Sequence, residues 1–326
     1  MFILKLLKLL KFFLIFIFSY IIVCISIYTI SGFLLISGIK PKFELIKHYQ
    51  RNFYFYGGLR NIWQSKKECI DFDEDTIFIP KKSSCNFKNL EFDTTISFDK
   101  YGRYSEHILK NGPGVAVLGD SHAMGWGVND HETFSAKLEK KINRPVYNLG
   151  VSGYGTLREL IRFEKSGLIE MVDTVVIQYC YNDWGENNNF KKNSFEEAKK
   201  KFDLIGNSKP MSTLKKLRKI FRYSITIPID IITDKNQLMD FDHHNKVLQE
   251  IIQSASILKD KKIVVIYANG FNMKFKNFPN EQSKKIKNLY YQDLDLGEEH
   301  FYQIDGHLTA YGHNYIAEKL NEFLSN

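Results

Sequence analysis

The sequence predicts an α/β protein, a three-layer α/β/α sandwich around a parallel sheet that is preceded by one transmembrane helix. After residue 112, short apolar strand-like runs alternate with helical segments, which is typical of a parallel sheet covered by helices. Near the N-terminus, a run from Phe12 to about Ile39 holds no charge, and roughly 20 apolar residues suffice to cross a bilayer. With 44% hydrophobic and 25% charged residues, the 326-residue composition is otherwise that of an ordinary globular protein.

Residues 1–40 are predicted to be an uncleaved signal anchor. A cleavable signal peptide has an apolar core of roughly 7–15 residues and ends in a small-residue cleavage site, whereas this run is longer and no A-x-A pattern closes it. Three lysines before the run favour a cytoplasmic N-terminus, and Lys40 and Lys42 behind it weaken that bias without reversing it. We therefore expect a single-pass protein of the bacterial inner membrane, with its main domain in the periplasm or otherwise outside.

Residues 41–111 show no sustained helical period and are expected to form a juxtamembrane stalk or a small β element. They contain short β-like pieces at 76–79 and 95–98, and a turn-forming Asn-Gly-Pro-Gly stretch ends the segment. Cys69 and Cys85 lie in this part and would meet an oxidising environment in the expected orientation. The sequence leaves open whether the two come close enough to form a disulfide.

The main domain, with its catalytic function, is expected over 112–326. Four strands are predicted from apolar runs, at 115–118, 145–149, 173–181 and 263–267. Helices are predicted at 133–142, from 156 onward and from 310 to the end. A lysine-rich insertion at about 186–260 is expected to add two or three helices, the last at 247–258, over or beside the site.

The formal net charge of +8 is spread over many lysines. In a cytosolic protein it would suggest nucleic acid, but beside a membrane anchor we expect no nucleic-acid partner. Acidic envelope polymers or lipid headgroups are the expected neighbours, and for any single run, such as Lys215-Lys216, a solvated helix face is the simpler interpretation. No cofactor or metal is expected: no CxxC pair is present, and the acidic and histidine run at 240–244 is read as a helix start.

Polar groups follow the predicted strands at the points where the strands end. Ser121 follows the first strand, a glycine-rich stretch at 148–155 the second and Asn182-Asp183 the third, while Asp305-Gly306-His307 precedes the last helix. Because the carboxyl ends of parallel strands meet at one edge of the sheet, these pieces are expected to assemble one site.

The chemistry that these groups suggest is acyl transfer. Ser121 would attack an ester carbonyl, His307 would accept its proton, and Asp305 would hold the imidazole in the productive tautomer. The oxyanion needs preorganised donors. The expected donors are the backbone N–H groups of Ser121 and Gly153 and the side-chain amide of Asn182.

In order and residue type, these pieces resemble the four blocks of the SGNH or GDSL hydrolases: Gly119-Asp120-Ser121, then Gly153, then Asn182-Asp183, then His307. The resemblance covers about residues 112–326 and implies a flavodoxin-like sandwich. Together with the anchor it implies the membrane-bound envelope branch, which includes carbohydrate esterases and O-acetyltransferases. The implied substrate is an acylated carbohydrate or other ester, and transfer would also need a membrane-bound partner that supplies the acyl group.

The chain departs from the family pattern at three positions. His122 stands where the family has Leu or Phe, Cys180 replaces a glycine, and Asp305 precedes His307 by two residues instead of three. A backbone carbonyl could then replace Asp305 as the orienting group. A catalytically weak binding or scaffold component of a polysaccharide-modifying complex is therefore kept as the alternative function.

Several neighbouring residues are further candidates for the site. His300 and His313 flank the Asp305 loop and could replace His307 if the last helix started elsewhere. Either Trp126 or Trp184 could stack on a sugar ring, although plain packing explains both equally well. The candidates for substrate contact are Asp120, His122, Tyr154, Asp183 and Trp184.

Overall fold

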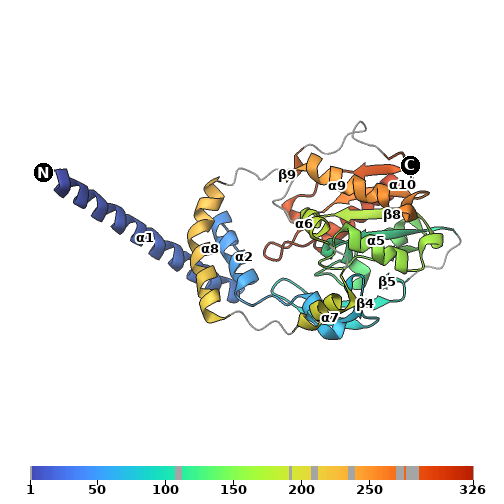
Figure 1. Cartoon of the computed structure of the whole chain (residues 1–326), viewed down its shortest axis with the longest axis horizontal. Helices are drawn as coiled ribbons and strands as arrows, with labels where there is room; N and C mark the ends of the chain where they lie inside the picture. Colours follow the sequence, from blue (N-terminus) through green and yellow to red (C-terminus); the bar gives the residue numbers. More distant parts are fainter. Residues whose placement is uncertain are drawn as a thin grey trace. The chain divides into compact units, whose positions relative to one another are not determined.

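The computed structural model describes residues 2–106, 112–190, 193–206, 212–233, 239–268, 275–276 and 286–325. The chain forms two compact units (Figure 1). The first, called the helical unit below, consists of Met1–Arg60, Lys209–Lys235 and Gln303–Asp305. The second, called the α/β unit, consists of Asn61–Ser208, Asn236–Tyr302 and Gly306–Asn326.

The α/β unit is built on an eight-stranded sheet whose larger part is parallel. The parallel strands are β6 (Gly114–Gly119), β7 (Val146–Asn148), β8 (Val172–Tyr179), β10 (Lys262–Tyr267) and β12 (Leu289–Gln292). They lie in the order β12-β10-β8-β6-β7, so β6, the first of these five in the chain, lies between the second, β7, and the third, β8. This is the flavodoxin-type order, in which ligands bind where the strand order reverses, here between β6 and β8.

Helices cover both faces of this sheet (Figure 1). They are α4 (Phe134–Ile142), α5 (Thr156–Lys165), α9 (Phe241–Ser254) and α10 (Ala310–Ser325). Successive strand residues point to opposite faces, so Ala116 and Leu118 pack with α5 and α9, whereas Val115 and Val117 pack with α4 and α10. Both faces of the sheet are therefore buried from water, which explains why the sequence of β6 is a continuous apolar run. The predicted three-layer sandwich is confirmed.

Beyond β7 the sheet continues with three antiparallel strands: β5 (Gly102–Arg103), β4 (Asp93–Asp99) and β3 (Ser84–Lys88). A separate hairpin joins β1 (Ile70–Asp73) to β2 (Ile77–Pro80). Sequence analysis found the β-like pieces near 76–79 and 95–98, but it did not place β3–β5 in the main sheet. The deciding pair is Arg103 with Asn148, and such a distant partner leaves no local pattern.

A disulfide joins Cys69 to Cys85, which resolves the question that the sequence left open. The bond ties the turn before β1 to strand β3. Strand β12 was not predicted, because its Leu-Tyr-Tyr-Gln sequence lacks the apolar run of the central strands.

The insertion expected at 186–260 does not form one body. Helices α6 (Tyr181–Asn189), α7 (Phe195–Leu204) and α9 belong to the α/β unit, as does the short β9 (Met239–Asp240), which pairs with β11 (Phe275–Lys276). Helix α8 (Thr213–Thr233) belongs to the helical unit. The insertion thus contributes helices to both units.

The helical unit packs α8 against α1 (Phe2–Ile36) and α2 (Glu44–Tyr56). Among the described residues, one helix is long and apolar enough to cross a membrane, the Ile3–Ile36 part of α1. Helix α2 was not expected within 41–111. Its packing face carries Leu45, Tyr49 and Phe53 at helical spacing, beside the buried polar side chains of Lys47 and Gln50.

Candidate active site

Ser121 follows a turn that only glycine allows. Strand β6 ends at Gly119, whose φ of +150° is unfavourable for other residues, and a Cβ there would lie 2.6 Å from both Ala123 Cβ and Gln178 Oε1. The same Gln178 oxygen accepts hydrogen bonds from the backbone N–H groups of Asp120 (3.2 Å) and Ala123 (3.0 Å). These bonds fix the turn to the neighbouring strand β8. Ser121 is the first residue of the short helix α3 (Ser121–Met124) that follows.

Gln178 is a functional residue that the sequence motifs do not include. The residue is fully buried in the middle of β8, between Ile177 and Tyr179. A single amide inside a buried apolar strand was the available signal, since a buried polar side chain needs partners.

His307 lies against the hydroxyl of Ser121, with 2.8 Å between Nε2 and Oγ. The loop that carries it is closed by two backbone hydrogen bonds, from Tyr302 N to His307 O (2.8 Å) and from Thr309 N to His300 O (2.9 Å). The ring of His122 lies 4.9 Å from that of His307, centroid to centroid. A serine hydroxyl within hydrogen-bond reach of an imidazole is the arrangement that general-base activation of a nucleophile requires.

The two other histidines near this loop are engaged elsewhere. The backbone N–H of Phe134 donates to Nδ1 of His313 (3.1 Å), and burial lowers the pKa of His313 to about 3. Nδ1 of His300 lies 3.0 Å from the backbone nitrogen and 3.2 Å from the backbone oxygen of Gly297, and the His300 ring stacks on Tyr311. The structure thus places His307 beside Ser121, whereas His300 and His313 make other contacts.

Asp120 is buried and orients the neighbouring groups. Its Oδ1 accepts a hydrogen bond from the backbone N–H of His122 (2.9 Å), and its Oδ2 accepts one from Nδ2 of Asn182 (3.3 Å). Because an amide nitrogen carries two hydrogens, this contact fixes the Asn182 amide and leaves its second hydrogen for another acceptor. Asn182 itself stands in the first turn of α6, just after β8.

Gly153 lies in the loop after β7 with a φ of +82°. The loop is held at Ser152, whose Oγ donates to Oε1 of Gln64 (3.0 Å), and at Arg158, whose guanidinium donates to the Gly153 carbonyl and to Glu186 (2.6 Å). The three expected oxyanion donors thus come from the ends of β6, β7 and β8, which are neighbours in the sheet.

The carboxylate of Asp305 is buried and has partners that sequence analysis did not foresee. Its Oδ2 accepts hydrogen bonds from the Tyr54 hydroxyl (2.9 Å) and from Nε of Arg60 (3.2 Å). All three residues belong to the helical unit, whereas His307 belongs to the α/β unit. A carboxylate offers about four lone-pair sites, so these two contacts do not exhaust Asp305.

Three buried carboxyl groups, those of Asp120, Glu159 and Asp183, lie behind the site. Burial raises the pKa of all three. The charge on Asp120 raises the pKa of Glu159 further, and the charges on Glu159 and Asp120 do the same for Asp183. Asp183 Oδ2 accepts a hydrogen bond from the backbone N–H of Cys180 (2.8 Å). Sequence analysis missed Glu159, which stands on the buried side of α5 beside Leu160.

Four of the five candidates for substrate contact are buried: Asp120, His122, Tyr154 and Asp183. The Tyr154 hydroxyl donates to the backbone carbonyl of Phe78, so this residue holds the fold together. Of the five, only Trp184 is exposed, and its ring lies 5.3 Å from that of His243. The structure thus places four of the five candidates in buried positions and only Trp184 at the surface.

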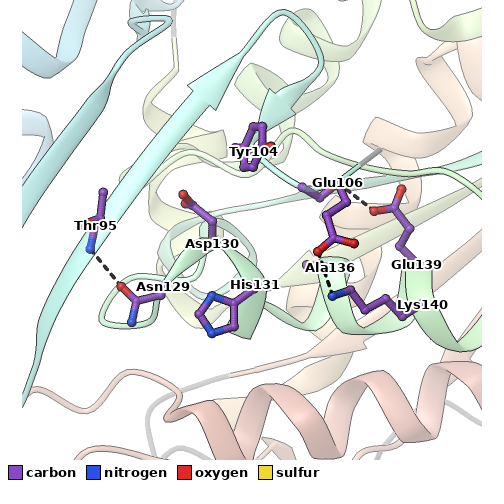
Figure 2. A pocket seen from close by; sticks show the side chains of 10 residues that line it. Thr95, Tyr104, Glu106, Asn129, Asp130, His131, Ala136, Glu139 and Lys140 are labelled. Carbon is purple, nitrogen blue, oxygen red and sulfur yellow. Dashed lines mark hydrogen bonds and ion pairs between the residues drawn. The ribbon is translucent and has the colours of Figure 1, made fainter. Parts of the chain in front are cut away.

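A hollow of about 300 Å³ lies elsewhere in the α/β unit, beside β4 and α4 (Figure 2). Its lining includes Tyr104, His131 and three carboxylates, but none of the expected site residues. The carboxylates are all paired: Asp130 with Arg103 Nε (2.8 Å), Glu139 with Ser105 Oγ (2.8 Å) and Glu106 with Lys140 Nζ (3.2 Å). These groups stabilise the fold around the hollow.

Among the described residues, no group of three His, Cys, Asp or Glu side chains could hold a metal ion. In the histidine run that begins α9, His244 contacts the Tyr179 hydroxyl through Nδ1 at 2.9 Å. The ring of His244 is buried, and this hydrogen-bonding contact gives its Nδ1 a partner within the protein.

No family model matches this chain, and neither does any curated protein. Among solved structures, it is similar to a putative lipolytic protein of the G-D-S-L family from Desulfitobacterium hafniense, with 13% identity, a TM-score of 0.37 and coverage of 65% of this chain and 99% of the other. It is also similar to a family two carbohydrate esterase from Clostridium thermocellum, with 11% identity, a TM-score of 0.34 and coverage of 66% and 64%.

A third similar structure is a carbohydrate esterase family 2 enzyme with a carbohydrate-binding domain from Corynascus thermopiles (Myceliophthora fergusii). It shares 11% identity with this chain at a TM-score of 0.33, with coverage of 67% and 68%.

Proposed function

We propose that this protein is a serine-dependent esterase or O-acyltransferase that acts on acyl esters, foremost acetyl esters, of cell-envelope polysaccharide. The observation that carries the proposal is the 2.8 Å contact between Ser121 Oγ and His307 Nε2, placed directly after β6 where the strand order of the sheet reverses.

The reaction proceeds through an acyl-enzyme. Ser121 Oγ attacks the ester carbonyl while His307 Nε2 takes the hydroxyl proton, and the oxyanion is stabilised by the N–H groups of Ser121 and Gly153 and the amide of Asn182. When the intermediate collapses, the alcohol leaves with the proton from His307. Water or a sugar hydroxyl then attacks the acyl-enzyme, with His307 again as the base, which frees Ser121.

Asp305 is proposed to orient the imidazole of His307, and Asp120 to orient the amide of Asn182. Helix α1 is proposed as a single inner-membrane anchor, with the α/β unit in the periplasm or outside. The disulfide between Cys69 and Cys85 supports this compartment, because disulfides persist in oxidising environments.

The test uses the full-length protein in detergent or nanodiscs with an aryl acetate, with and without an oligosaccharide acceptor. Ser121→Ala is expected to lower the rate by about 10³-fold or more, because the nucleophile is lost. Ser166→Ala is the matched control, a half-buried serine whose hydroxyl bonds to the carbonyl of Phe163. Equal rates for wild type and Ser121→Ala would refute the proposal, and an acceptor-dependent product would identify a transferase.

The alternative, a catalytically weak binding or scaffold component, is favoured by one observation. Asp305, the expected orienting group, is held by Tyr54 and Arg60. A fluorophosphonate probe separates the two functions, because it labels only an activated serine. Labelling of wild type but not of Ser121→Ala supports the enzyme, and equal absence of labelling in both supports the scaffold.

A further inference from the structure

Helix α8 presents three different faces, and one of them is accounted for by packing within the helical unit. Ser224 and Ile227 are buried, and the latter packs with Tyr28 of α1 and Tyr49 of α2. Two hydrogen bonds fix the helix there, from the Tyr49 hydroxyl to Ser224 O (2.8 Å) and from the Tyr20 hydroxyl to Ile225 O (2.9 Å). This face holds α8 in place and leaves the opposite side of the helix outward.

The second face is an exposed apolar stripe. Five large side chains stand at residues 2, 5, 9, 17 and 20 of the helix, a spacing that keeps them on one side at 3.6 residues per turn. Their exposed fractions are large: Leu214 78%, Leu217 57%, Phe221 48%, Ile229 49% and Ile232 82%. Exposure of so much apolar surface to water is unfavourable, so the stripe indicates contact with an apolar environment.

The third face is basic and borders the stripe. Lys215, Arg218 and Arg222 are exposed, and Lys219 lies with its Nζ 5.0 Å over the ring of Tyr56. From residue 213 to residue 229 the sequence holds no acidic residue that could neutralise them. An apolar stripe beside a row of cations is the signature of a helix that lies in a membrane interface.

Two observations favour a lipid surface over a second copy of this chain. Helix α1, against which α8 packs, has its residues 3–19 uniformly exposed and mostly apolar, so the apolar surface of the unit extends beyond α8. A second copy that covered the stripe in a symmetric pair would also bring the two basic rows near each other, which costs free energy. Anionic headgroups neutralise the row instead.

We propose that α8 lies in the membrane interface, with its apolar stripe at the acyl-chain boundary and its basic face against anionic lipid headgroups. The chain is then held to the bilayer by a second element besides α1. This inference goes beyond the proposed function, because it depends neither on the esterase chemistry nor on whether α1 spans the whole bilayer.

The experiment reconstitutes the full-length protein into vesicles that contain brominated lipid, which quenches tryptophan at the acyl-chain boundary. Leu217→Trp on α8 is compared with Leu204→Trp on α7, a matched position that is 60% exposed against 57%. Phe13→Trp reports on α1. In phosphatidylcholine with phosphatidylglycerol, the added tryptophan at 217 is expected to lose about twofold more fluorescence than that at 204, since only the former meets lipid.

Removal of the charges should weaken the contact. Quenching at position 217 is expected to fall about twofold in pure phosphatidylcholine or in the Arg218→Gln/Arg222→Gln background, where the headgroup attraction is lost. Phe221→Trp gives a second reporter on the same stripe, and circular dichroism checks that each variant folds.

Equal quenching at 217 and 204 overturns the proposal, whether or not Phe13→Trp is quenched. Quenching absent at 217, together with cross-linking between copies through Leu217→Cys, would assign the stripe to a second copy. Aryl acetate hydrolysis is measured on the same samples. Lipid contact without hydrolysis would support this inference and contradict the proposed function. Hydrolysis without lipid contact would support the proposed function and contradict this inference.

Discussion

The two units of this protein place the same kinds of side chain in opposite surroundings. In the α/β unit, Val115 to Leu118 are completely buried, whereas in the helical unit Phe12 is 72% and Ile232 is 82% exposed. The difference arises because β6 has strands on both sides and helices on both faces, while α1 and α8 each have neighbours along only part of their surface. Apolar content alone therefore does not define a core, and the outward apolar surface of the helical unit is the basis of the lipid contact proposed for it.

The largest effect is expected from His307→Gln, which would break the chemistry of the α/β unit and leave the helical unit unchanged. Loss of the base should lower kcat/KM for an aryl acetate by about 10³-fold, with vesicle association as in wild type. His243→Gln, an exposed histidine on α9, is the control. A change in lipid association would contradict the separation of the two units.

Arg103→Met is expected to destabilise the α/β unit by about 3–5 kcal/mol, because a buried ion pair loses one partner. The buried guanidinium donates to Asp130 Oδ1 (2.8 Å) and to the carbonyls of Met124, Gly125 and Val128. Thermal unfolding measures the loss. The half-exposed Arg144, paired with Asp173 at 2.6 Å, is the control, and Arg144→Met should cost no more than about 1 kcal/mol.

Glu159→Gln should change how stability depends on pH. Burial raises the pKa of Glu159 well above its ordinary value, so the folded protein keeps a proton that the unfolded chain releases. Wild type therefore loses stability as pH rises from the ordinary carboxyl pKa toward the raised one, by about 1.4 kcal/mol for each unit between them. The glutamine variant escapes this loss.

The advantage of Glu159→Gln in melting temperature over wild type should thus be larger at pH 8 than at pH 4. Glu164→Gln, at an exposed position of the same helix, should show no such trend. Parallel pH profiles for Glu159→Gln and wild type would mean that this carboxyl does not hold its proton in the folded protein.

The smallest effect is expected in the helical unit. Tyr49→Phe removes the hydroxyl that donates to Ser224 O and should cost about 1 kcal/mol, because the carbonyl of Ser224 is left without that donor. Hydrogen exchange of α8 amides in nanodiscs measures it, and activity should not change. Faster exchange across the α/β unit would show that the two units do not respond separately.

Much of the α/β unit was predictable because its signals are local. The strands at 115–118 and 263–267 are apolar runs, and the helices at 133–142 and 310–326 carry periodic apolar stripes. The exceptions in this unit are β12 and β5, which depend on strand partners distant in the chain. The same holds for Gln178, Tyr54 and Arg60, whose contacts lie 55 or more residues away.

Three features can be predicted from the sequence alone, because each depends on neighbouring residues: the long apolar run near the N-terminus, the alternating pattern of the sandwich and the order of polar groups at the strand ends. Other features emerge only from the folded chain: which histidine meets Ser121, which groups hold Asp305, and that α8 packs with α1. The physical reason is that these pairings join segments far apart in the chain, and no local period encodes which distant surface will bury a given side chain.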